Sequence, residues 1–205
     1  AALNTGRLPV RSGLLAPSLL NDDADAAREI FAAKLLSDAG YRTAMSGKWH
    51  LGEKDGSRPW QVGFDEFFGN LYHLNSEEER ENPDYPKDPA FDEKFGTRGV
   101  LDCKATDKDD STVDPRFGKV GKQTIEDTGT LTRDRMKVVE TELLERSLDF
   151  IDRAKKSGKP FFLWHNTTRM HTHSPKGLCS SCKKVVRLDK LASMDRVACA
   201  LLPRC

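Results

Sequence analysis

A long amphipathic helix followed by an apolar strand constrains this chain more than any other feature. Residues 133–156 carry apolar side chains at helical spacing along one face. The stripe consists of Met136, Val139, Leu143, Ser147, Phe150, Ile151 and Ala154. Thr132 suits the N-cap of this helix, while Gly158 and Pro160 suit its end. Residues 161–164 are then continuously apolar, which predicts a buried, parallel strand.

A shorter helix–strand unit precedes this one. Residues 22–39 predict a helix, because acidic residues gather at its start and apolar residues share one face. The aspartates are Asp22, Asp23 and Asp25, and the apolar face carries Ile30, Phe31, Leu35 and Ala39. Gly40 suits the helix end, and residues 41–45 alternate weakly as a short strand. Alternating helices and strands predict an α/β fold with a largely parallel sheet.

The middle of the chain gives a different pattern. Residues 60–132 are polar, with proline and glycine at close intervals, as in "NSEEERENPDYPKDP". This composition predicts long irregular loops. Runs of charge in such loops favour a solvated surface, so we assign them no chemistry.

Both predicted strands run into polar segments that contain histidine. The first is "SGKWHLG", residues 46–52, and the second is "HNTTRMHTHSP", residues 165–175. In open α/β sheets, ligands gather at the carboxyl ends of the strands. The candidate side chains are Lys48, His50, His171 and His173.

These residue types suit the handling of an anion. Lysine offers a fixed positive charge with three donors, and histidine exchanges a proton near neutral pH. Together they suit a reaction in which negative charge moves to a leaving oxygen. An ordinary turn with satisfied histidines is the alternative interpretation. We expect His165, on the strand itself, to be a packed histidine and Trp49 to be a core residue.

Composition excludes several classes of function. The net charge of +1 gives no global field for nucleic acid or an anionic membrane, so we expect neither partner. No run approaches the roughly 18 apolar residues of a membrane span. A phosphate-binding loop ending in GKS/T, an HExxH motif and a GxSxG motif are all absent from the sequence.

Cysteine is concentrated at the end of the chain. Cys103 stands alone, whereas Cys179, Cys182, Cys199 and Cys205 follow within a short tail. The Cys-x-x-Cys pair leaves a zinc site open as an alternative. We favour spare thiols, because the second pair lacks the two-to-four-residue spacing of compact zinc sites.

Several stretches resemble one enzyme family. "AGYRTAMSGKWHLG" is very similar to the second signature of the sulfatase family, the formylglycine-dependent sulfuric ester hydrolases. The opening "AALNTGR" resembles the Thr-Gly-Arg end of the first signature, and later blocks resemble bacterial arylsulfatases. Those blocks are "GFDEFFGNLYHLN", "DPRFGKVGKQTIEDTG" and "PFFLWHNTTRMH". The likeness divides the chain into a partial catalytic domain, residues 1–172, and a divergent cysteine-rich tail, residues 173–205.

The resemblance implies an alkaline-phosphatase-like α/β/α sandwich with a mainly parallel sheet, incomplete in this chain. It implies hydrolysis of a sulfate ester, carried by a small molecule or a carbohydrate, to an alcohol and sulfate. In the family, a Cys or Ser becomes formylglycine and attacks sulfur, while calcium or magnesium holds the sulfate oxygens. A periplasmic or secreted location follows from family habit.

By the same resemblance, three residues carry over to the site. Lys48 corresponds to the lysine that contacts formylglycine and sulfate. His50 corresponds to the histidine paired with a formylglycine hydroxyl. His171 corresponds to the histidine that binds sulfate and gives a proton to the leaving oxygen, whereas His173 has no secure counterpart.

The chain also departs from the family pattern. The residue that becomes formylglycine would precede Ala1, and the family's metal-binding pairs would lie beyond both ends. Asp22 and Asp23 sit at a predicted helix start, so we read them as capping residues and expect no metal ligand here. We therefore expect a marginally stable, inactive fragment. The alternatives are a phosphodiesterase or phosphonate hydrolase of the alkaline phosphatase superfamily, or a truncated, non-catalytic product with a zinc-binding tail.

Overall fold

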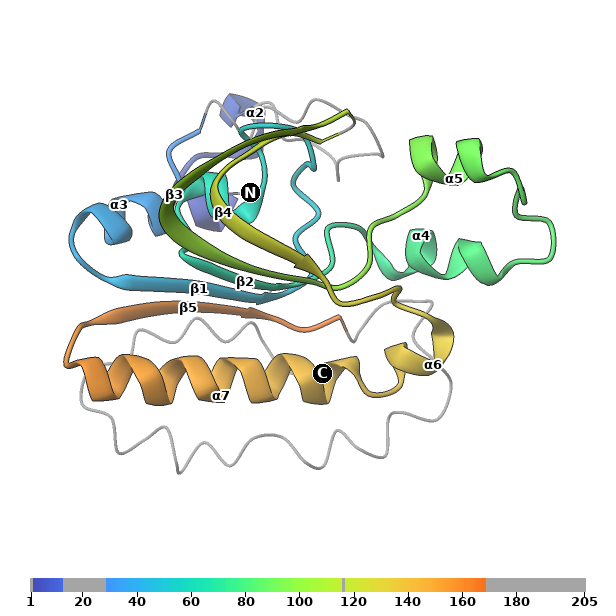
Figure 1. Cartoon of the computed structure of the whole chain (residues 1–205). Helices are drawn as coiled ribbons and strands as arrows, with labels where there is room; N and C mark the ends of the chain where they lie inside the picture. Colours follow the sequence, from blue (N-terminus) through green and yellow to red (C-terminus); the bar gives the residue numbers. More distant parts are fainter. Residues whose placement is uncertain (1, 13–28, 116, 169–205) are drawn as a thin grey trace.

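A computed structural model describes residues 2–12, 29–115 and 117–168 of the chain. At its centre lies a five-stranded sheet with the strand order β4-β3-β2-β1-β5 (Figure 1). The strands are β1 Arg42–Gly47, β2 Glu66–Gly69, β3 Leu101–Asp114, β4 Gly118–Asp127 and β5 Phe161–Asn166. β1 pairs in parallel with β2 and β5, whereas β3 pairs antiparallel with β2 and β4. The predicted α/β fold is confirmed. The sheet, which the sequence predicts to be mainly parallel, is parallel over β5-β1-β2 and antiparallel over β2-β3-β4.

Helices lie on both faces of the sheet. They are α1 Ala2–Thr5, α2 Pro9–Ser12, α3 Ala32–Asp38, η2 Pro59–Val62, α4 Leu74–Glu78, η3 Glu79–Glu81, α5 Pro89–Phe95, α6 Arg133–Met136 and α7 Val139–Ser157. The long helix α7 runs under β1 and β5, and α3 lies on the opposite side (Figure 1). Helices α4 and α5 form a lobe beyond the ends of β1 and β2 (Figure 1).

The second helix–strand unit is confirmed in detail. All seven residues of its predicted apolar stripe are buried. Thr132 caps the first turn, since its Oγ1 accepts a hydrogen bond from the Arg135 N–H at 3.1 Å, and Gly158 ends α7 at a φ of 67°. The predicted single helix is broken, however, into α6 and α7. A tightened turn at Val138 lets Met136 and Val139 both reach the same apolar cluster.

Strand β5 is parallel to β1, as predicted. Phe161 faces Arg42 and Asn166 faces Gly47 across the pair. The prediction of a buried strand is wrong, because every residue of β5 is half-buried. β5 lies at the end of the described sheet, so only one of its backbone edges is paired there.

Helix α3 is shorter than predicted. Residues 29–31 are not helical and the helix begins at Ala32, while residues 22–28 lie outside the described residues. Phe31 is extended and buried, with its ring centroid 5.7 Å from that of Trp49. Packing against this indole therefore overrides the local helical pattern. The predicted apolar face is wrong as well, because Leu35 is 60% exposed.

The prediction of irregular loops over residues 60–132 is wrong. This region forms β2, the α4–α5 lobe and the long β3–β4 hairpin. The hairpin curls back over the loop that follows β1 (Figure 1), where Arg58 Nη2 donates to the Lys119 carbonyl at 2.8 Å. The outer half of β3 is exposed on both faces. Its sequence therefore lacks the alternation by which a half-buried strand is recognised.

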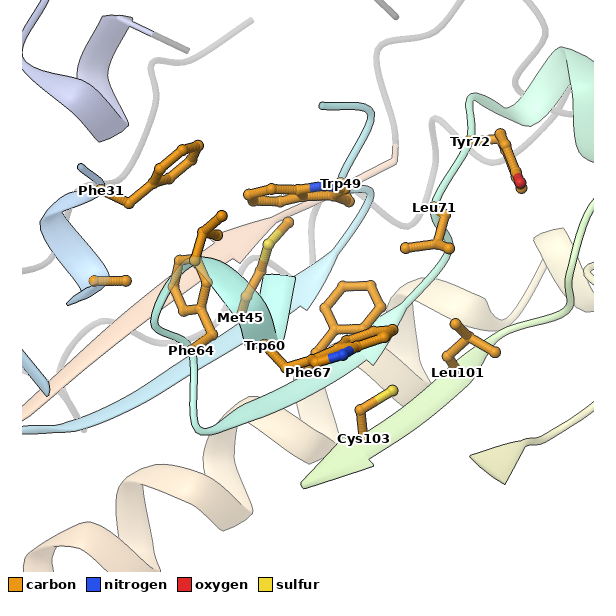
Figure 2. Packing of buried hydrophobic residues seen from close by; sticks show 12 residues of the cluster. Phe31, Met45, Trp49, Trp60, Phe64, Phe67, Leu71, Tyr72, Leu101 and Cys103 are labelled. Carbon is orange, nitrogen blue, oxygen red and sulfur yellow. The ribbon is translucent and has the colours of Figure 1, made fainter. Parts of the chain in front are cut away.

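The main core lies between the sheet and the loops above it (Figure 2). Trp49, Trp60 and Phe64 pack there with Phe67 of β2, which confirms Trp49 as a core residue. Cys103 is buried in the same cluster, and burial raises the pKa of its thiol. In the described part of the chain, no helix is long and apolar enough to cross a membrane. The cysteine-rich tail, and with it the zinc alternative, lies outside the described residues.

Candidate active site

Three strand ends meet at one edge of the sheet, with almost no space between their backbones. A Cβ atom on Gly47 would lie 1.8 Å from the Asn166 carbonyl oxygen, and one on Gly69 would lie 2.0 Å from the Gly47 oxygen. Both glycines are thus required by the close approach of β1, β2 and β5. Asn166 also forms two hydrogen bonds with Lys48, the residue after Gly47. The Asn166 carbonyl accepts from the Lys48 N–H at 3.3 Å, and Asn166 Nδ2 donates to the Lys48 carbonyl at 2.5 Å.

The loop after β1 is bound to the chain after β2. The N–H groups of Trp49 and His50 donate to the carbonyls of Asn70 and Leu71, each at 3.0 Å. The indole of Trp49 is buried, and its Nε1 donates to the Ser57 carbonyl at 2.9 Å. Trp49 therefore anchors the loop in the core, and its two neighbours remain half-buried at the strand edge. This explains why a tryptophan stands between two basic side chains.

Lys48 is the charged centre of this edge. Burial lowers the pKa of its ammonium group, and no opposing carboxylate contributes. Among the described residues, no hydrogen bond or ion pair to its Nζ is present. An ammonium group that has lost part of its water without gaining a partner favours a bound anion.

A second histidine faces His50. His73 follows β2 as His50 follows β1, and the two ring centroids lie 5.1 Å apart at an interplanar angle of 47°. His73 also caps α4, where its Nδ1 accepts a hydrogen bond from the Ser76 N–H at 3.3 Å. Sequence reasoning missed His73 because it did not predict the strand over residues 66–69. The available signal was the recurrence of histidine shortly after each parallel strand.

The structure brings together only part of the predicted site. Lys48 and His50 lie on one loop at the carboxyl end of β1. His171 and His173 lie outside the described residues, which end at Thr168. The segment leading to them is fixed at the same edge, since the Thr168 N–H donates to Glu140 Oε1 at 2.7 Å.

His165 is a packed residue, as predicted. Its Nδ1 lies 2.9 Å from Ser147 Oγ, and burial lowers the pKa of the imidazole. No group of three or more His, Cys, Asp or Glu side chains within residues 2–12, 29–115 and 117–168 could hold a metal ion. The described part of this edge therefore presents the ammonium group of Lys48 and the imidazoles of His50 and His73.

Comparison with known proteins identifies the family. The family model described as Sulfatase matches residues 2–190. The chain belongs to the sulfatase family. This confirms the family resemblance and the alkaline-phosphatase-like fold expected from the motifs.

Curated sulfatases are similar over most of the chain. Arylsulfatase G of Rattus norvegicus is 30% identical over 181 residues, covering 83% of this chain and 31% of the relative. N-acetylgalactosamine-6-sulfatase of Canis lupus familiaris is 29% identical over 187 residues, covering 85% of this chain and 30% of the relative. The chain thus spans slightly under a third of the length of these two sulfatases.

A solved sulfatase has a similar fold. The crystal structure of PsFucS1 sulfatase from Pseudoalteromonas sp. matches with a TM-score of 0.64 and 32% identity, covering 85% of this chain and 34% of that one. The structure of Ps i-CgsB in complex with k-i-k-neocarrahexaose matches with a TM-score of 0.53 and 24% identity, over 84% and 34% of the two chains. At that identity the second match supports the fold alone.

Proposed function

We propose that the protein hydrolyses a sulfate ester to an alcohol and sulfate. One observation carries this proposal: the half-buried Lys48 ammonium has no anionic partner among the described residues, and it lies beside His50 at the carboxyl end of a parallel strand. Such a charge stabilises an oxyanion more strongly than an exposed lysine does, because less water screens it. Membership of the sulfatase family supports sulfate as the anion.

Each proposed side chain has a separate role. Lys48 binds a sulfate oxygen and stabilises the negative charge that grows as the ester bond breaks. A ring nitrogen of His50 accepts a proton from the nucleophile's hydroxyl group. His171, on the segment after β5, binds sulfate and gives a proton to the leaving oxygen.

The sulfatase family generally works with a metal ion and formylglycine. Calcium, or magnesium, is the ion we propose for the intact enzyme. The described residues do not fit such an ion, since they contain no cluster of ligands for it. The roles of Lys48 and His171 toward the sulfate do not depend on which nucleophile attacks it, whereas the partner proposed for His50 is the hydroxyl group of that nucleophile.

We propose a small-molecule or carbohydrate sulfate as the substrate. The names of the two curated relatives support this range, since one is an arylsulfatase and the other acts on an N-acetylgalactosamine 6-sulfate group. Neither a nucleic acid nor a membrane is part of the proposed reaction.

The test uses the full-length gene product with two chromogenic esters, p-nitrophenyl sulfate and bis-p-nitrophenyl phosphate. We expect turnover of the sulfate, and Lys48→Ala should lower kcat/KM by roughly 100- to 1,000-fold, as the loss of an oxyanion-binding group does. Lys122→Ala, at an exposed lysine of β4, is the matched control and should leave the rate unchanged. Hydrolysis of the phosphodiester in preference to the sulfate would instead identify the protein as a phosphodiesterase of the alkaline phosphatase superfamily.

A further inference from the structure

We propose that His73 is a positioning residue of this site, whose ring fixes the orientation of the His50 imidazole. The inference rests on the proposed function and extends it to a residue that does not itself touch the sulfate. It starts from the contact between the two rings, whose centroids are 5.1 Å apart. This separation lies within the 4.5–7 Å range in which aromatic rings attract each other.

The two histidines are brought together by the sheet rather than by chance contact of side chains. His50 follows β1 and His73 follows β2, and these strands are paired in parallel. The backbone of His50 is bound to the Leu71 carbonyl at 3.0 Å, two residues before His73. The two segments that carry the rings are therefore held side by side by the backbone.

The ring of His73 is itself held in place. Its Nδ1 accepts from the Ser76 N–H at 3.3 Å, and its Nε2 lies 2.9 Å from Ser76 Oγ. An Nδ1 that accepts a hydrogen bond carries no proton, so the neutral ring has its proton on Nε2 and donates it to Ser76 Oγ. Ser76 is buried, which fixes both contacts within the first turn of α4. His73 is thus a fixed surface for a neighbouring ring.

The backbone of His50 is itself unusual. Its φ of 55° lies in the left-handed region, which few non-glycine residues adopt. Proton transfer requires close alignment, so an imidazole that turns away from the reacting atoms lowers the rate while leaving substrate binding intact. The loss of His73 should therefore appear in kcat rather than in KM.

A purely structural role as the N-cap of α4 can be separated from this positioning role by two substitutions. His73→Asn keeps a good capping side chain but removes the ring, whereas His73→Phe keeps a ring but removes the capping nitrogen. In the full-length gene product, we expect His73→Asn to keep its Tm and lose roughly ten- to a hundredfold in kcat with KM unchanged. We expect His73→Phe to keep most of its kcat and to show a lower Tm than the wild type, as the loss of a helix cap does.

Asp88→Ala provides the matched control. Asp88 caps α5 through its Oδ1, which accepts from the Ala90 N–H at 3.0 Å, and it belongs to the same lobe. Its loss should lower Tm by a similar amount without affecting kcat. If activity follows Tm across all three variants, with His73→Phe the slower of the two His73 variants, His73 is a cap only and the proposal is overturned.

A second measurement does not depend on sulfatase activity. In NMR spectra of the full-length gene product, the ring protons of His50 sense the ring current of residue 73. His73→Asn should remove the ring-current shift of these resonances, and His73→Phe, which keeps a ring at this position, should retain a ring-current shift. Unmoved His50 resonances in His73→Asn would overturn the contact. Failure of the full-length protein to cleave p-nitrophenyl sulfate would instead count against the proposed function alone.

Discussion

Glu77 predicts an unusual dependence of stability on pH. This residue of α4 is fully buried, and neither of its carboxyl oxygens makes a hydrogen bond of ordinary geometry to the described residues, although the Thr97 hydroxyl lies near enough to interact with the carboxyl group. Burial raises the pKa of Glu77 to about 8, against smaller opposing effects of the Thr97 hydroxyl and the Arg80 guanidinium. The carboxyl group is therefore protonated in the folded protein at pH values where an exposed glutamate is ionised.

The direction of the effect follows from the two protonation states. Below pH 4.5 the carboxyl is protonated in both the folded and the unfolded chain, so it contributes no pH dependence. Between pH 4.5 and about 8 the unfolded chain releases the proton while the folded protein keeps it, so the free energy of unfolding falls as the pH rises. Above about pH 8 the loss is complete.

The size of the loss is large for a chain of this length. A change of one pKa unit corresponds to about 1.4 kcal/mol, so a rise from 4.5 to about 8 corresponds to roughly 5 kcal/mol as an upper value. Small proteins have free energies of unfolding of about 5–15 kcal/mol. Ionisation of Glu77 alone should therefore remove a substantial part of the stability at alkaline pH.

Urea unfolding of the wild type and of Glu77→Gln, measured from pH 4.5 to 9, tests this. Glutamine has nearly the same shape and cannot ionise, so the Glu77→Gln protein should lack the fall between pH 5 and 8 and be the more stable form at pH 9. We expect a gain of about 2–4 kcal/mol there, because the new amide group also lacks hydrogen-bond partners. Glu93→Gln, at an exposed residue of α5, is the control and should follow the wild type. Parallel curves for wild type and Glu77→Gln across this range would refute the reasoning.

Two further substitutions test the close contact of the strand ends and the role proposed for His171. Gly47→Ala places a methyl group 1.8 Å from the Asn166 carbonyl oxygen and should lower the free energy of unfolding by several kcal/mol. Gly121 has open space around it, so Gly121→Ala should cost only the roughly 1 kcal/mol expected for a strained φ. Urea titrations of the two variants measure this difference. His171→Ala should lower the turnover of p-nitrophenyl sulfate by the full-length gene product roughly a hundredfold, as the loss of a general acid does, and an unchanged rate would remove His171 from the proposed site.

The parts of the fold that were predictable are those with a strong apolar period. The stripe along α7 and the apolar run of β5 both need a buried partner, and each side chain of the stripe finds one. The β3–β4 hairpin gave no such signal, because most of its outer residues face solvent on both sides. The start of α3 was missed because Phe31 packs against Trp49, a contact between segments that local periodicity does not encode.

Only part of the candidate site could be predicted from the sequence. Lys48 and His50 stand out because they follow a recognisable strand, and the sulfatase motif contains both. His73 follows β2, which is only four residues long and leaves little periodicity to detect. The hydrogen bond between Asn166 and Lys48 joins residues 118 positions apart, so only the folded sheet reveals it.

The contact of bare backbones at Gly47 and Gly69 has a consequence for how the proposed site can change. Since no side chain separates these strand ends, the ammonium-bearing loop inherits the rigidity of the sheet and has no room to be re-aimed by single substitutions. Changes in substrate preference are then expected in loops that the sheet does not hold so closely. Chemistry and recognition would thereby change independently of each other, the first held constant by geometry and the second free to vary.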